Sequence, residues 1–156
     1  MNSLCFEIQS NEEIWFLIDK NIDHVFVHKF IPNGSTSWWK TNLKMPNDER
    51  LDNIEVRNMA FDIQTNLEGL KKILEFNTHQ LRIYQFEKPV PDTLDLDYLT
   101  DQNREKILLQ NGLKHIYFCD FEFITIESND TEFLKSIENS ETFKDRIAER
   151  KNSLNK

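Results

Sequence analysis

Short hydrophobic runs separated by polar segments make up the first part of the chain. Residues 4–8, 14–18 and 25–31 are apolar runs of strand length, and we predict a β-strand in each. The polar residues 19–23 predict the turn between the second and third of these strands. Residues 32–34, with the sequence PNG, predict another turn, because Asn and Gly tolerate the positive φ angle of a tight hairpin.

Further strands are expected in the middle of the chain and beyond it. The predicted sheet continues through Trp38 and Trp39. Residues 54–63 fit a strand, although their spacing also fits a helix. Residues 81–86 and the long apolar run 115–127 complete the set of predicted strands.

Helical periodicity becomes clear after residue 64. Thr65 and Glu68 have the spacing of a capping box, which predicts the start of a helix. The apolar stripe of this helix consists of Leu67, Leu70, Ile73 and Leu74. Thr100 predicts the cap of a second helix, which we expect to end at Gly112, because glycine readily adopts the left-handed conformation that follows a helix C-terminus.

Two more helices are predicted near the C-terminus. Asn129 and Glu132 resemble another capping box, and an amphipathic helix follows from Ser140, with Phe143 and Ile147 pointing inward. The order of elements predicts an α+β fold: an antiparallel or mixed sheet of about five to seven strands, with three or four helices packed mainly on one face. We expect a single domain over residues 1–150 and a frayed basic tail over residues 151–156.

The composition supports a folded domain and limits its partners. The 156 residues are 38% hydrophobic and 12% aromatic, which is unlike a disordered chain. The net charge of −8 argues against direct binding to nucleic acid and favours a basic protein partner. We recognise neither a signal peptide nor an apolar run of the roughly 20 residues that span a membrane. We therefore expect a cytoplasmic protein with two buried, reduced thiols at Cys5 and Cys119.

Asp120 and Glu122 interrupt the apolar run 115–127. In one continuous strand they share a face, because successive side chains alternate. Their apolar neighbours on that face are Ile116, Phe118, Ile124 and Ile126. An isolated buried carboxylate is costly, so three interpretations stay open: a hydrated centre, a binding patch, or a carboxylate pair for acid/base or metal chemistry.

Two other segments are candidates for contact with a partner. Residues 92–101 hold four aspartates without a basic residue, among them Asp95 and Asp97, and fit either a solvated loop before a helix or an acidic contact surface. Adjacent strand residues point in opposite directions, so Trp38 and Trp39 cannot both enter one core. One of them either covers an edge of the domain or anchors a protein contact.

Signs of catalysis are weak. His24 and His28 share a strand face and could bind zinc together with Asp120 or Glu122 from across the sheet; ordinary surface or partly buried histidines are the alternative. We recognise no Gly-rich phosphate loop, GxSxG elbow or HExxH motif in the sequence. We therefore expect a protein that is not an enzyme and has no cofactor.

These observations predict a small acidic binding protein that occludes a basic protein partner, most concretely an immunity protein that neutralises a bacterial toxin such as a nuclease. Two alternatives are a DNA-mimic inhibitor of a host defence enzyme and a metal-dependent hydrolase that uses His24, His28, Asp120 and Glu122. Homo-oligomerisation stays open. The predicted partner-binding residues are Asp95, Asp97, Asp120, Glu122, Trp38 and Trp39.

Overall fold

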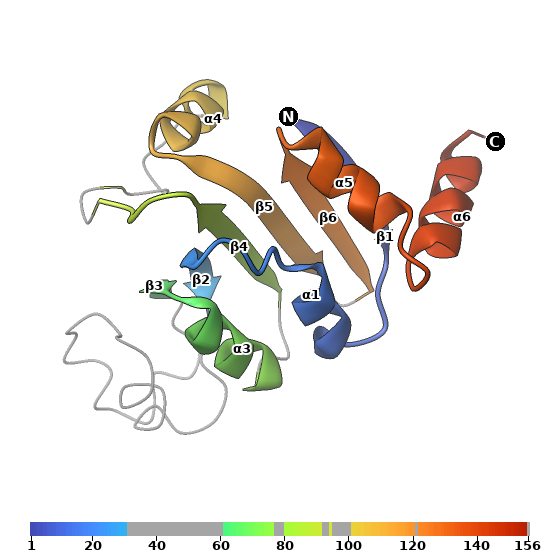
Figure 1. The fold of residues 1–156 in the computed structure, drawn as a ribbon, viewed down its shortest axis with the longest axis horizontal. Helices are drawn as coiled ribbons and strands as arrows, with labels where there is room; N and C mark the ends of the chain where they lie inside the picture. The colour runs from blue at the N-terminus through green and yellow to red at the C-terminus, as the bar shows by residue number, and fades with distance from the viewer. Residues whose placement is uncertain (31–60, 77–79, 92–93, 95–100, 121, 156) are drawn as a thin grey trace.

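The chain forms a six-stranded antiparallel sheet with helices packed against it (Figure 1). This computed structural model describes residues 1–30, 61–76, 80–91, 94, 101–120 and 122–155. The strands are β1 (Asn2–Glu7), β2 (His24–Phe30), β3 (Phe61–Thr65), β4 (Leu81–Phe86), β5 (Leu113–Asp120) and β6 (Phe123–Ser128). The helices are α1 (Asn11–Leu17), α3 (Leu67–Phe76), α4 (Asp101–Gln110), α5 (Thr131–Glu138) and α6 (Lys144–Leu154). The predicted α+β class is confirmed.

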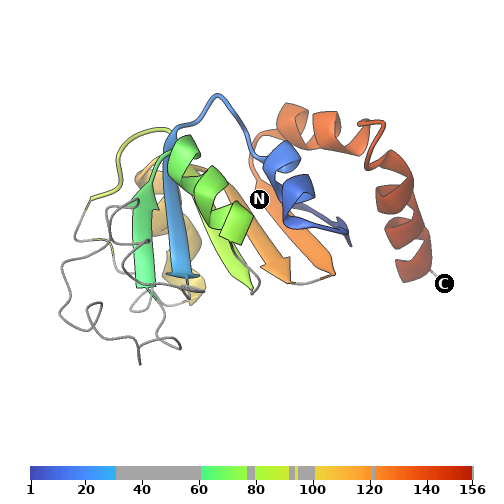
Figure 2. The ribbon, with the colours of Figure 1, turned by 90° about the horizontal axis from the view of Figure 1, so that it is seen from below.

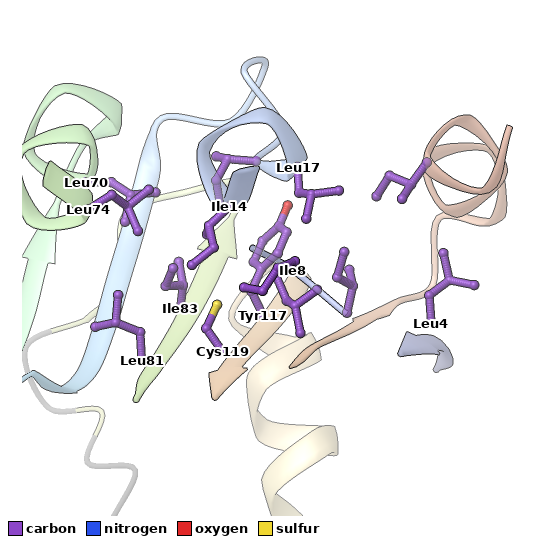
Figure 3. Packing of buried hydrophobic residues seen from close by; sticks show 14 of the residues in the cluster. Leu4, Ile8, Ile14, Leu17, Leu70, Leu74, Leu81, Ile83, Tyr117 and Cys119 are labelled. Atoms are coloured by element: carbon purple, nitrogen blue, oxygen red, sulfur yellow. The ribbon is translucent and has the colours of Figure 1, made fainter. Parts of the chain in front are cut away.

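The strands are ordered β1-β6-β5-β4-β2-β3 in the sheet. Each face of the sheet carries its own hydrophobic cluster. On one face, α1, α3 and α5 lie side by side over the strands (Figure 2), and α6 adds Ile147 to the same core. Ile14 of α1 lies near the sheet residues Ile83 and Tyr117, and Leu70 and Leu74 of α3 lie beside each other in the same core (Figure 3). On the other face, α4 contributes Leu108 to a smaller cluster. The helices therefore pack mainly on one face, as the apolar stripes predicted.

The strand predicted for residues 14–18 is wrong, because these residues belong mostly to helix α1. Ile14, Leu17 and Ile18 are buried, which is the i, i+3, i+4 spacing of a helix face. Alternation in a strand would bury Phe16 together with Ile14, whereas the Phe16 side chain is 64% exposed. A five-residue apolar run is short enough to fit either period.

The long strand predicted for residues 115–127 is a hairpin. Asp120 pairs with Phe123, so the chain reverses direction between these two residues. Because the chain reverses there, Ile124 pairs with Cys119 and Ile126 pairs with Tyr117, and all four side chains enter the main core. The prediction that Ile124 and Ile126 flank the two acids is therefore wrong. Asp120 and Glu122 instead lie at the exposed end of the hairpin, where water solvates their carboxylates.

Helix boundaries follow local chemistry, with small shifts from the predictions. Helix α3 begins one residue later than predicted: the Asn66 side chain accepts a hydrogen bond from the backbone N–H of Gly69 at 2.9 Å. Likewise Asp130, one residue after the predicted cap, accepts from the backbone N–H of Phe133 at 3.0 Å. Gly112 follows α4 with a φ of 87°, as predicted.

Two predicted elements lie partly or wholly beyond the described residues. Strand β3 begins at Phe61, inside the predicted strand 54–63, and residues 54–60 lie outside the described residues. The segment with Trp38 and Trp39 also lies outside them. Among the described helices, none has the length and apolar composition that crossing a membrane requires.

Candidate protein-binding surface

Three neighbouring strands bring acids and an exposed phenylalanine together at one end of the sheet. Phe123 of β6 pairs with Asp120 of β5 on one side and with Glu7 of β1 on the other. Directly paired residues point to the same face of a sheet, so these three side chains form one row across it. All three are exposed, Phe123 by 36%, and Glu122 is exposed in the adjoining turn. We call Glu7, Asp120, Glu122 and Phe123 the hairpin surface.

The hairpin surface keeps its negative charge available. Within the described part of the chain, Glu7, Asp120 and Glu122 form no ion pair. Elsewhere in the described part, glutamates lie within 4.0 Å of a lysine or arginine: Glu13, Glu75, Glu87, Glu132, Glu138 and Glu141. Glu12, Glu68, Asp145 and Glu149 are likewise exposed without an ion pair in the described part, so unpaired acids are not confined to the hairpin surface.

A half-buried strip continues from the hairpin surface along the same face. The next cross-strand row contains Arg82, Phe118, Thr125 and Cys5. The Arg82 guanidinium lies 5.0 Å from the centre of the Phe118 ring, a cation–π contact that leaves the ring partly exposed. The face therefore combines aromatic area with charge, which is typical of protein contact surfaces.

The two cysteines lie on opposite faces of the sheet and are both free thiols. Cys5 belongs to the half-buried strip, whereas Cys119 lies in the main core on the far side of β6. Burial raises the pKa of the Cys119 thiol to about 12. The prediction of two buried free thiols holds for Cys119 and is wrong for Cys5, which is only half-buried because its face of β1 lies in the strip.

The predicted zinc ligands do not meet. His24 and His28 lie on β2, and β4 separates that strand from β5, which carries Asp120. His28 instead contacts Asp62 of β3, with Nδ1 and Oδ1 2.8 Å apart. Among the residues that the structure describes, no three His, Cys, Asp or Glu side chains could hold a metal ion together. The hydrolase that used these four residues therefore lacks its site.

A buried polar network on the helix-covered face was not predicted from the sequence. His115 is fully buried; its Nε2 lies 2.9 Å from Oδ2 of Asp19, and its Nδ1 lies 2.8 Å from Oγ of Ser128. Burial lowers the pKa of His115 despite its hydrogen bond to Asp19. For Asp19, burial alone would raise the pKa, but hydrogen bonds from the Asn21 backbone and from His115 outweigh it, and the pKa is lowered.

Ser128, His115 and Asp19 are the residue types of a catalytic triad, and here they connect parts of the fold. The Ser128 hydroxyl is fully buried and accepts a hydrogen bond from the backbone N–H of Asp130 at 2.9 Å. The His115 ring stacks on Phe133, with ring centres 3.9 Å apart, which covers the imidazole. The contact between Asp19 and His115 connects the loop after α1 to the sheet. No local motif marks it, because Asp19 and His115 are 96 positions apart.

The remaining predicted site residues are Asp95, Asp97, Trp38 and Trp39, and all four lie outside the described residues. Of the predicted set, the structure places Asp120 and Glu122 together, and it adds Glu7 and Phe123, which the sequence did not single out. Comparison with protein-family models, with curated proteins and with solved structures finds no match to this chain.

Proposed function

We propose that this protein binds a basic protein partner through the hairpin surface. The observation that carries this proposal is the row of Glu7, Phe123 and Asp120, in which an exposed ring stands between two carboxylates. Carboxylates form charge-assisted hydrogen bonds with arginine and lysine, and an aromatic face attracts the same cations. The acidic net charge of −8 would also steer a positively charged partner toward this chain.

The concrete form that we propose is inhibition by occlusion, as in an immunity protein that covers the active site of a toxin. A nuclease is a suitable target, because its active site is positively charged to hold phosphates. A standard interface covers about 800 Å² of each partner, more than the hairpin surface alone provides. Asp95, Asp97 and one of Trp38 and Trp39 stay predicted contributors to the rest of the interface.

The proposal is tested by affinity capture from the source organism with matched variants. The test variant carries Asp120→Lys and Glu122→Lys. The control variant carries Glu132→Lys and Glu141→Lys, which changes the net charge by the same amount at two other exposed acids. Glu132 pairs with Lys135 of α5, and Glu141 pairs with Lys144 at the start of α6. We expect the wild type and the control to capture the same basic protein and the test variant to lose it.

Kinetics of the captured pair give the second measurement. Reversing charges at the hairpin surface should lower the association rate and reduce its dependence on salt, because steering depends on the local field. Equal capture and equal association rates for the test and control variants would remove the hairpin surface from the interface.

A further inference from the structure

Helix α6 brings its own positive charge to the hairpin surface. The Arg150 guanidinium lies 5.0 Å from the centre of the Phe123 ring. One turn earlier, Arg146 donates to both carboxylate oxygens of Glu13, at 2.9 and 2.7 Å, and to the Glu7 carbonyl at 3.4 Å. Figure 2 shows α6 running beside the β1 side of the sheet, which lets its side chains reach the row of Glu7 and Phe123.

The two halves of α6 are held differently. Its first half is anchored by Ile147, the one buried residue among residues 144–154, and by the Arg146 ion pair with Glu13. Its second half rests on Arg150 and on the ion pair between Lys151 and Glu138. Helix α6 carries four basic and two acidic side chains, so its net charge is positive, as we propose for the partner.

The contact of Arg150 is chemically incomplete. Its Nε atom is buried without a hydrogen-bond partner in the described structure, and a buried donor without an acceptor costs free energy. Its guanidinium lies over the Phe123 ring, which stays 36% exposed, and neither Asp120 nor Glu122 forms an ion pair with it. A partner arginine that reached both the ring and these carboxylates would make the more complete contact.

We propose that the second half of α6 is an internal competitor for the hairpin surface: Arg150 occupies the Phe123 ring, and a basic partner displaces it on binding. This inference rests on the proposed function and adds its regulation. Affinity for a cationic ligand should therefore be set partly by how firmly α6 holds its own arginine at the site.

The test measures the binding of a fluorescent deca-arginine peptide to the full chain by anisotropy. Arg150→Ala should raise the affinity about 2- to 5-fold, the value expected from an exposed cation–π contact. Lys144→Ala is the matched control, because it removes one positive charge from α6 at a side chain that pairs with Glu141 and makes no contact with the Phe123 ring. Arg150→Lys keeps a cation above the ring and should bind like the wild type.

The outcomes separate the two proposals. If the wild type binds the peptide and Arg150→Ala binds no more tightly than Lys144→Ala, internal competition is overturned and the proposed function stands. If neither the wild type nor Arg150→Ala binds, both proposals fail. Hydrogen exchange gives an independent measurement. Saturating peptide should speed amide exchange in residues 148–154 of the wild type and leave exchange in α5 unchanged. Slower exchange in residues 148–154 would overturn the proposed competition.

Discussion

Replacing Gln85 with leucine tests whether the buried polar network stabilises the fold. Gln85 is fully buried on β4. Its Nε2 donates to the carbonyls of Asp19 at 2.9 Å and Ile22 at 3.1 Å, and its Oε1 accepts from the Tyr117 hydroxyl at 2.6 Å. Gln85→Leu keeps the approximate shape of the side chain but removes the Gln85 partner of these three groups. The Asp19 backbone N–H, which also donates to Gln85 Oε1, keeps the Tyr117 hydroxyl as an acceptor at 3.3 Å.

The expected cost follows from the number of groups left unpaired. An unsatisfied buried polar group costs roughly 1–3 kcal/mol, and the two loop carbonyls are only partly buried, so the lower end applies to each. We therefore expect the free energy of unfolding to fall by about 3 kcal/mol. In a chain of this size the melting temperature should drop by roughly 6–12 °C.

The assay is urea unfolding of the wild type, Gln85→Leu, Tyr117→Phe and the double variant, followed by circular dichroism. Tyr117→Phe alone should cost about 1 kcal/mol, because Gln85 Oε1 keeps the hydrogen bond from the Asp19 backbone, at 3.2 Å. The double variant no longer strands the tyrosine hydroxyl, but it removes both acceptors of the Asp19 backbone N–H, Gln85 Oε1 at 3.2 Å and the Tyr117 hydroxyl at 3.3 Å. It should therefore cost about as much as Gln85→Leu alone, which is less than the sum of the single variants. If Gln85→Leu costs under 1 kcal/mol, or if the two costs simply add, the network does not stabilise the fold in the way described.

Three further predictions concern thiols, acid and packing. A thiol reagent should modify Cys5 quickly in the folded protein and Cys119 only after denaturation, because burial keeps the latter protonated; equal rates would contradict its placement. The free energy of unfolding should fall as the pH drops below about 6.5, since the unfolded state binds a proton that His115 refuses in the folded state; the slope should shrink in His115→Gln, measured by urea unfolding at pH 7.5 and 5.5. Leu70→Ala, at a fully buried position, should cost about 2–5 kcal/mol in the same assay, and a cost below 1 kcal/mol would mean that α3 does not pack as described.

The sequence predicted the elements whose hydrophobic residues follow a long or unambiguous period. It did not predict the features that depend on which strands pair. The stripe of α3 spans two turns, so Leu70, Ile73 and Leu74 were placed in the core without knowledge of the sheet. The hairpin was not predicted because residues 120–123 have the sequence DFEF, which lacks the Gly or Asn that marks most tight turns. Sequence alternation alone therefore put Ile124 on the wrong face.

The candidate surface could be predicted only in part, for a related reason. Asp120 and Glu122 stand out in the sequence as acids within an apolar run. Glu7 and Phe123 join them through strand register, because β1 pairs with β6 although more than 110 positions separate the two strands. The network around His115 likewise depends on which strands are neighbours, and no local spacing encodes that order.

Asp19 and Asp120 show two solutions to placing a carboxylate in a chain rich in aromatic residues. Asp19 is largely buried and already holds hydrogen bonds from His115 and from the Asn21 backbone. A partner could improve little on these bonds, and breaking them would cost stability. Asp120 and Glu122 face water at the hairpin end, so a partner cation exchanges hydration for an ion pair beside an exposed ring. We therefore expect a basic partner to contact Asp120 and Glu122 rather than Asp19.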